Sequence, residues 1–211
     1  MKFCVIGIGR FGSAVATTLA NRGMEVMAID KDEKIIESIK DQVSQAICME
    51  VTNEDSLRSL GLEDMDAIVV AMGEHFDQSI LITAILKQNL KFPRVIVSSI
   101  SDTHKNILRL IGADQILLPE QEIGILLADN LSLRFESLAV FTPQFSVSKL
   151  PAPKKFVGKS INALHEQFHV LCIAREIKGI LTPIEYNYTI QANDVVLLSG
   201  YNKNLDKVSK L

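Results

Sequence analysis

Short, continuously apolar runs alternate with helical patterns over the first 135 residues of the chain. The runs lack the strict alternation of a half-exposed strand, which indicates strands buried on both faces of a parallel sheet. We expect strands at Phe3–Ile8, Glu25–Ile29, Gln45–Met49, Ala67–Met72, Arg94–Ser99 and Gln115–Leu118. We expect helices at Phe11–Asn21, Asp32–Lys40, Glu54–Leu60, Phe76–Asn89, Thr103–Ile111 and Glu120–Phe135. This β-α order predicts an α/β fold with a doubly wound parallel sheet.

The rhythm changes after Phe135, where short strands surround one helical pattern at Ser160–Gln167. The expected strands are Leu138–Thr142, Phe145–Leu150, Val170–Arg175, Ile180–Pro183 and Val195–Gly200. Charge changes at the same point. Residues 1–137 hold 13 Lys and Arg against 20 Asp and Glu, a balance of −7, whereas residues 138–211 hold 9 against 5, a balance of +4. We therefore predict two domains, 1–137 and 138–211, the second a small α+β lobe.

Composition narrows the class of protein. The 211 residues are 47% hydrophobic with a net charge of −3, which excludes intrinsic disorder. The longest stretch without a charge, Ser137–Ser148, is shorter than the roughly 18 apolar residues of a membrane-spanning helix. Met1-Lys2 leads directly into a short apolar run and a glycine motif, a pattern unlike a signal peptide. We expect a cytoplasmic protein.

The cysteines are widely separated in the sequence. Cys4, Cys48 and Cys172 each lie in an apolar run, and no CxxC pair occurs. We therefore expect buried structural thiols, with neither a disulfide framework nor a thiolate zinc site.

A glycine motif follows the first expected strand and opens the first expected helix. The residues Gly7-Ile8-Gly9-Arg10-Phe11-Gly12 form GxGxxG. In this context Gly7 allows a tight turn, Gly9 lets the backbone approach a pyrophosphate, and Gly12 lets helix and strand pack closely. A phosphate then meets free N–H groups at the positive end of the helix dipole. The motif predicts a Rossmann-like nucleotide-binding domain, although its glycines would also serve packing alone.

Two further side chains specify the expected ligand. Asp30 closes the second strand, where a carboxylate accepts both hydroxyls of an adenosine ribose and repels the 2′-phosphate of NADP. Arg10 places a guanidinium beside the phosphates, which favours ATP or ADP and leaves NAD(H) open. His75, in the loop after the fourth strand, is a candidate ligand contact or an ordinary loop residue. Neighbouring positions complete the candidate site: Phe11, Lys31, Met72 and Gly73.

Other motifs in the sequence do not support a reaction. Val157-Gly158-Lys159-Ser160 ends like a P-loop, but Pro153 stands where that motif needs glycine. His165 and His169 have no evident third ligand for zinc. The 74 residues after the predicted sheet contain no recognisable set of catalytic acid, base or nucleophile residues. We therefore predict a binding protein and not an enzyme.

Several short motifs together resemble the regulators of potassium conductance, the RCK family. They are the GIGRFG loop, Asp30, Glu50-Val51-Thr52-Asn53, Ile111-Gly112-Ala113-Asp114, Leu118-Pro119-Glu120, and the stretch from Val157-Gly158-Lys159-Ser160 to Asn193-Asp194-Val195. The resemblance covers almost the whole chain and is greatest to the free-standing cytosolic regulatory subunits of bacterial Ktr and Trk potassium uptake systems.

The resemblance implies a regulatory role in potassium transport. It implies dimers that assemble into an octameric ring beneath a membrane-embedded potassium-translocating subunit, so that the chain lies at the inner face of the membrane through its partner. It implies ATP, ADP or NAD(H) in the N-terminal domain, and a ligand-driven change of the ring that gates the partner. We expect no nucleic-acid partner.

The resemblance also assigns individual residues. Gly7, Gly9, Arg10 and Gly12 match the phosphate loop and Asp30 the ribose position, while Glu50 and Val51 fall at the adenine position. The family usually has Asp or Asn followed by Ala at these two positions, so Glu50 and Val51 depart from its pattern. Glu120 matches an acidic residue that helps to bind a divalent or monovalent cation near the phosphates. Arg175 and Pro183 fall where some relatives contact cyclic di-AMP in the C-terminal lobe.

Two other classes remain as alternatives. A small NAD-dependent oxidoreductase would turn over NADH with a substrate, for which the sequence offers no catalytic groups. A redox-sensing DNA-binding regulator would need a basic recognition helix, and the pI of 5.8 and the absence of a basic helical stripe argue against it.

Overall fold

The computed structural model describes residues 1–73, 75–132, 136–142, 144–185 and 187–211. It divides into two compact units, Met1–Glu122 and Ile123–Leu211, which are described separately below. The predicted boundary after residue 137 lies further along the chain, past the helix α6 (Pro119–Ser132). The domain limits 1–137 and 138–211 therefore stay a prediction.

The first unit is built on a parallel sheet. Its described strands are β1 (Lys2–Ile6), β2 (Glu25–Asp30), β3 (Gln45–Cys48), β4 (Ala67–Val70), β5 (Val95–Ser98) and β6 (Gln115–Leu117). They lie in the order β3-β2-β1-β4-β5-β6, and every pairing is parallel. This order reverses direction between β1 and β4, which makes that point the crevice of a doubly wound sheet. The predicted Rossmann-like fold is confirmed.

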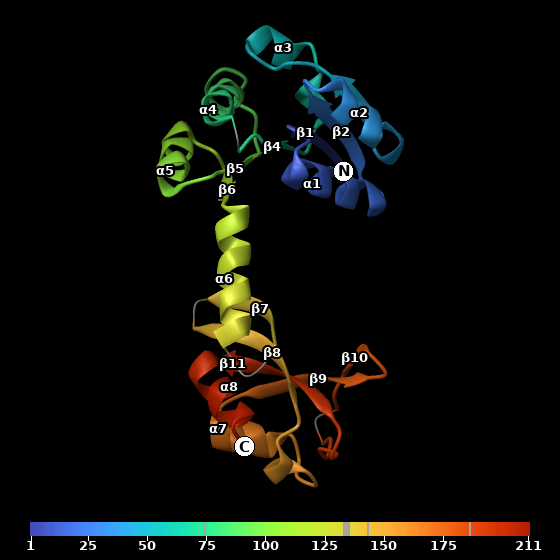
Figure 1. The fold of residues 1–211 in the computed structure, drawn as a ribbon, viewed down its shortest axis with the longest axis vertical. Helices are drawn as coiled ribbons and strands as arrows, with labels where there is room; N and C mark the ends of the chain where they lie inside the picture. The colour runs from blue at the N-terminus through green and yellow to red at the C-terminus, as the bar shows by residue number, and fades with distance from the viewer. Residues whose placement is uncertain (74, 133–135, 143, 186) are drawn as a thin grey trace. The chain divides into compact units, whose positions relative to one another are not determined.

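Helices cover both faces of this sheet. The helices of the unit are α1 (Arg10–Asn21), α2 (Glu33–Ile39), α3 (Glu54–Arg58), α4 (Phe76–Ala84), α5 (Asp102–Ile111) and the start of α6. Figure 1 shows α1 and α2 on one side of the strands and α4 and α5 on the other. Two apolar clusters match these faces, one around Ala16, Ile36 and Ile39, the other around Leu57, Ile82 and Leu108. All four residues of β4 are buried, as expected for a central strand between two helical layers.

Local signals in the sequence explain where several helices begin and end. The Asp32 carboxylate accepts a hydrogen bond from the Lys34 N–H and so caps α2, as its position predicts. Gly112 ends α5 with a φ of +99°, a left-handed conformation that favours glycine. The helix expected at Phe76–Asn89 differs from a regular α-helix, because α4 ends at Ala84 and Ile85–Asn89 form a π-helical turn. Short 3₁₀ turns occur at Lys40–Gln42 and Leu62–Asp64.

The second unit holds an antiparallel sheet. Its described strands are β7 (Glu136–Thr142), β8 (Phe145–Pro151), β9 (Leu171–Ile177), β10 (Ile180–Pro183) and β11 (Val195–Tyr201), in the order β10-β9-β11-β8-β7. The helices α7 (Asn162–Phe168) and α8 (Asn202–Ser209) pack against it and enclose a core that includes Leu164, Val196 and Leu205. A 3₁₀ turn spans Lys154–Phe156. The predicted small α+β lobe is confirmed, although the sequence analysis missed α8.

The environment of the cysteines differs from the prediction at one position. Cys4 is buried in β1, and this burial raises the pKa of its thiol to about 12. Cys172 is half-buried, and burial followed by the negative charge of Asp194 raises the pKa of its thiol to about 12. The expectation of burial is wrong for Cys48, which is exposed because it ends β3, the edge strand of the parallel sheet.

In the part of the chain that the structure describes, none of the helices has the length and apolar character needed to span a membrane.

Candidate nucleotide-binding site

The main pocket of the first unit opens at the carboxyl ends of the parallel strands. Its volume is about 460 Å³, within the range of small-molecule sites. Residues that follow β1, β2 and β3 line one part, and residues that follow β4, β5 and β6 line the other. Ligands of doubly wound sheets bind in this crevice, where the strand order reverses.

The glycine loop lines the pocket. Each of its three glycines meets a different steric environment. Gly7 has a φ of +90°, and a Cβ atom there would lie 2.8 Å from Met72 Cγ and 2.9 Å from the Ala71 carbonyl oxygen. A Cβ atom at Gly12 would lie 1.9 Å from the Gly7 carbonyl oxygen. A Cβ atom at Gly9 would meet no described heavy atom within 4 Å. Gly7 and Gly12 therefore serve the turn and the packing, whereas Gly9 faces the space that a ligand would occupy.

The amino-terminal end of α1, where the first backbone N–H groups of a helix have no partner within the helix, borders the same space. The helix begins at the exposed Arg10, with Gly9 as its N-cap, and no acidic residue lies in its first turn. The positive end of the helix dipole repels the Arg10 guanidinium, and a bound anion would offset this repulsion. The start of α1 can therefore hold a phosphate group between backbone N–H groups and a guanidinium.

Asp30 joins three segments of the pocket wall. Its Oδ2 atom accepts a hydrogen bond from the Ile8 N–H at 2.7 Å, and its Oδ1 atom accepts one from the Asp32 N–H at 3.0 Å. Its carbonyl oxygen accepts a hydrogen bond from the Met49 N–H at 2.8 Å. A carboxylate has about four acceptor positions, so these bonds leave capacity for ribose hydroxyls.

The wall beyond Asp30 contains the residues predicted at the adenine position. Val51 is buried, while the Lys31 ammonium lies 3.9 Å from a carboxylate oxygen of the half-exposed Glu50. The Gln78 side-chain amide donates to the Val51 carbonyl oxygen at 3.4 Å. A second hollow of about 440 Å³ adjoins this wall and is lined by Lys31, Glu50, Thr52, His75, Asp77, Gln78 and Leu81. An apolar wall with a polar rim suits a heterocyclic base with exchangeable amino hydrogens.

The opposite wall comes from the fourth, fifth and sixth strands. Met72 and Gly73 follow β4, and His75 precedes α4 as its N-cap residue. The sequence analysis missed the contribution of Gln78, and of Ser98, Ser99 and Ile100 at the end of β5. The rule that identified His75, a position just after the carboxyl end of a buried parallel strand, would also have identified the residues after β5.

The residues predicted to bind the nucleotide and its cation line this pocket, with the exception of Gly12. Those that line it are Gly7, Gly9, Arg10, Phe11, Asp30, Lys31, Glu50, Val51, Met72, Gly73, His75 and Glu120. Gly12 lies behind the loop, against Gly7. Glu120 lies in the first turn of α6. Among the described residues, no group of three or more His, Cys, Asp and Glu side chains could hold a metal ion, so a cation at Glu120 would need further oxygen ligands such as phosphate or water.

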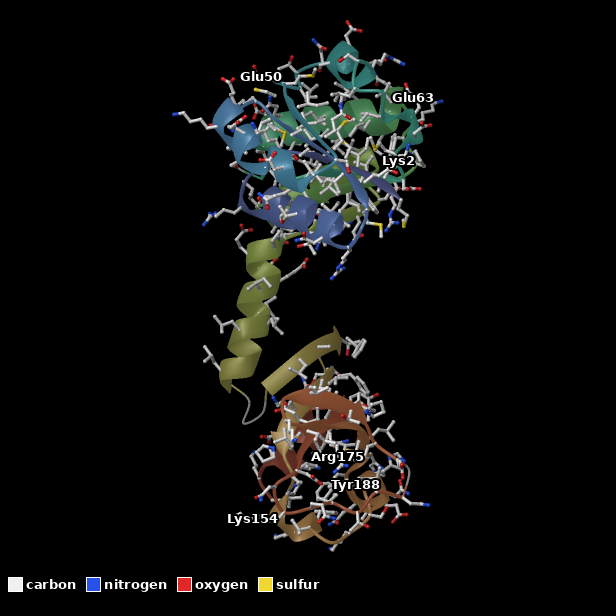
Figure 2. All side chains as sticks on the ribbon, turned by 90° about the vertical axis from the view of Figure 1, so that its right-hand side faces the viewer. Lys2, Glu50, Glu63, Lys154, Arg175 and Tyr188 are labelled. Atoms are coloured by element: carbon white, nitrogen blue, oxygen red, sulfur yellow. The ribbon has the colours of Figure 1, made fainter. Side chains whose placement is uncertain are left out.

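Arg175 and Pro183, the predicted cyclic di-AMP contacts, lie on neighbouring strands of the second unit. Arg175 on β9 lies opposite Thr182 on β10, and the neighbouring pair is Ala174 opposite Pro183. The Arg175 guanidinium donates to the Tyr188 hydroxyl at 2.6 Å and stacks over its ring at 4.4 Å. Figure 2 labels both side chains. The Tyr188 hydroxyl donates to the Asp194 carboxylate at 2.7 Å. Arg175 is therefore already engaged within its own unit.

A buried imidazole lies beside the pocket wall and escaped the sequence analysis. His104 in α5 is fully buried and packs on Phe76, the residue after His75, with 4.6 Å between ring centroids. Among the described residues neither ring nitrogen has a hydrogen-bond partner. Burial lowers the pKa of His104, because it disfavours the charged imidazolium.

Comparisons with known proteins agree with this architecture. The TrkA-N domain model matches residues 3–119, and the TrkA-C domain model matches residues 146–211. The Ktr system potassium uptake protein A of Bacillus subtilis (strain 168) is 30% identical over 214 residues, covering 98% of this chain and 94% of the relative.

Solved structures share the fold. The GsuK channel bound to NAD aligns with all of this chain at a TM-score of 0.66 and 16% identity, over 39% of its own length. The structure of GsuK bound to ADP aligns with 62% of this chain at a TM-score of 0.54 and 21% identity, over 34% of its own length. The predicted resemblance is confirmed by the two domain models and the Ktr relative: this chain belongs to the RCK family of proteins with TrkA-N and TrkA-C domains.

Proposed function

We propose that this chain is the nucleotide-binding regulatory subunit of a membrane potassium uptake system. The observation that carries the proposal is the pocket at the carboxyl ends of the sheet, in which the phosphate loop and Asp30 meet. The Ktr relative supports the potassium-linked role, because its match extends over almost the full length of both chains. The absence of a membrane-spanning helix among the described residues fits a role exercised on another chain.

The ligands that we propose for this pocket are adenine nucleotides. The start of α1 would hold the phosphates, the Asp30 carboxylate the ribose hydroxyls, and the wall at Val51 the base. A bound nucleotide would place negative phosphate charge beside the exposed Arg10 guanidinium. ATP and ADP are our first candidates, and NAD(H) is the second, in line with the NAD and ADP complexes of the GsuK channel.

Regulation would depend on contacts that differ between ligands. Arg10 would distinguish nucleotides by their terminal phosphate across a contact with a second copy of the chain. A ligand shifts a conformational equilibrium only by its difference in affinity for the two states, so this discrimination is the source of the switch. We further propose that dimers assemble into an octameric ring beneath the potassium-translocating partner. Glu120 would then contribute to a cation site at the phosphates.

The C-terminal lobe would add a second input. Cyclic di-AMP is an anion that suits a lobe with a balance of +4. Arg175 would meet such a ligand with the guanidinium donors that its contacts with Tyr188 and Asp194 leave available.

A thermal-shift panel on the purified chain tests the proposal, with ATP, ADP, NAD, NADH and cyclic di-AMP as ligands. We expect ATP or ADP to raise the melting temperature most and the mass in solution to exceed that of a dimer. Gly9→Ala should abolish the nucleotide-dependent shift without lowering the melting temperature of the free protein by more than a few degrees, because its Cβ atom enters open space. A panel in which no adenine nucleotide shifts the wild-type chain would contradict the assignment of the pocket.

A further inference from the structure

Asp30 contacts the phosphate loop directly, apart from any role toward a ribose. Its Oδ2 atom accepts the Ile8 N–H, which lies inside the loop between Gly7 and Gly9. The Ile8 side chain is buried, so this hydrogen bond and the core hold the residue from opposite sides. The Gly7 N–H donates to the Ile29 carbonyl oxygen at 2.8 Å, so consecutive amides of the loop are anchored to consecutive residues of β2.

Gly9, in contrast, has no comparable restraint from neighbouring side chains. A Cβ atom at Gly9 would meet no described heavy atom within 4 Å, and the residue has no side chain of its own to pack. Glycine has more conformational freedom than any other residue. The Gly9 carbonyl oxygen accepts the Ser13 N–H at 2.8 Å, so α1 holds Gly9 on one side, and Asp30 fixes its other neighbour, Ile8.

We propose that Asp30 is a positioning residue for the phosphate loop, in addition to the ribose contact that the proposed function gives it. Its carboxylate holds the Ile8 amide and the Asp32 amide at the same time, so the phosphate loop, the end of β2 and the start of α2 keep one fixed spacing. The nucleotide ligand in this proposal rests on the proposed function, whereas the contact between Asp30 and the loop is observed directly.

Loop positioning and simple electrostatics predict opposite effects of removing the Asp30 carboxylate on phosphate affinity. Asp30 is an anion beside an anion-binding loop, so removing its charge alone should strengthen the binding of a ligand that contains phosphates but no ribose. If the carboxylate positions the loop, its removal should weaken the binding of that ligand. Inorganic tripolyphosphate and adenosine separate the two roles, because one lacks the ribose and the other lacks the phosphates.

The experiment compares wild type with Asp30→Ala and Asp30→Asn by titration calorimetry. We expect Asp30→Ala to weaken both tripolyphosphate and adenosine by about tenfold or more, the scale of a lost hydrogen bond to a charged group. Asp30→Asn retains one acceptor oxygen and should lie between wild type and Asp30→Ala. Asp66→Ala is the matched control, since Asp66 also accepts a backbone N–H, from Lys2 at 2.7 Å, at the opposite end of the sheet.

Amide hydrogen exchange gives a readout that needs no ligand. The Ile8 amide should exchange about tenfold faster or more in Asp30→Ala, while amides in the middle of β5 keep their wild-type rates. A general loss of stability would instead accelerate both. The proposal is overturned if the Ile8 amide keeps its rate and tripolyphosphate binds the variants as tightly as wild type or more tightly. If wild type binds neither ligand, the proposed function fails, and the exchange rate still decides the role of Asp30 in the loop.

Discussion

A Cβ atom at Gly12 would lie 1.9 Å from the carbonyl oxygen of Gly7, far inside any tolerated contact. The two glycines are five residues apart, Gly7 directly after β1 and Gly12 in the first turn of α1. Their contact sets how closely the first helix can approach the first strand. The glycine pattern is therefore a requirement of the fold as well as of the proposed ligand.

Gly12→Ala should destabilise the protein, because the clashing partner is backbone and cannot move aside as a flexible side chain would. We expect a loss of at least about 2 kcal/mol in the free energy of unfolding, measured by urea denaturation. Gly9→Ala is the matched comparison within the same loop. Its loss should stay within about 1 kcal/mol, while the affinity for ADP should fall. Equal stability of the two variants would contradict the packing role of Gly12.

Arg10→Ala tests whether the first residue of α1 recognises the terminal phosphates. We expect titration calorimetry to show a loss of about tenfold or more for ATP, and a smaller loss for AMP, because a guanidinium contributes most where phosphate charge is densest. Arg22→Ala removes an exposed arginine at the other end of the same helix and should leave both affinities unchanged. Equal losses for ATP and AMP would contradict the role given to Arg10.

The sequence predicted the fold well where burial follows from a simple pattern. Continuously apolar runs identified all six strands of the parallel sheet. Local signals also act at helix ends, since the Asp32 side chain caps the start of α2 and the left-handed backbone of Gly112 ends α5. The exposure of Cys48 was not predictable in this way, because it depends on β3 being an edge strand, a property of the strand order and not of the run itself.

The candidate site was predictable to a similar extent. The glycine motif and Asp30 carry their chemistry in residue type and spacing, so they could be recognised without coordinates. The engagement of Arg175 with Tyr188 and Asp194 could not, because these residues are 13 and 19 positions away and the pairing of β9 with β11 brings Asp194, just before β11, close to Arg175. Hydrogen bonds of that kind leave no periodic trace in the sequence.

Tyr188→Phe should destabilise the second unit, because the hydroxyl both accepts from Arg175 and donates to Asp194. Burial and the Asp194 carboxylate raise the pKa of Tyr188, so the hydroxyl stays protonated over the neutral range and can donate. We expect a loss of about 1 to 2 kcal/mol in the free energy of unfolding by urea denaturation. Tyr201→Phe is the control, since Tyr201 is half-exposed and makes a ring contact with Phe145. A loss no larger for Tyr188→Phe than for Tyr201→Phe would contradict the network.

His104 should make the stability of the protein sensitive to mild acid. Burial lowers its pKa in the folded state, so the unfolded chain binds a proton more readily than the folded protein. The free energy of unfolding should therefore fall as the pH drops below about 6.5, the ordinary pKa of histidine, towards the lower pKa of the folded state. Urea denaturation at pH 7.5 and at pH values down to about 5 measures this fall.

His104→Leu should flatten the same pH profile, because leucine has nothing to protonate. It should not greatly lower the free energy of unfolding at pH 7.5. Both ring nitrogens of His104 are buried without a described hydrogen-bond partner, and an apolar side chain of similar size removes the free-energy cost of burying them unpaired. His165→Gln removes an exposed histidine of α7 and serves as the matched control. A profile that remains as steep in His104→Leu as in wild type would contradict the assignment of the acid sensitivity to His104. The pKa values of the Glu54 and Asp114 carboxyl groups are lowered in the folded state, so the stability that they contribute is lost at more acidic pH than the window assigned to His104.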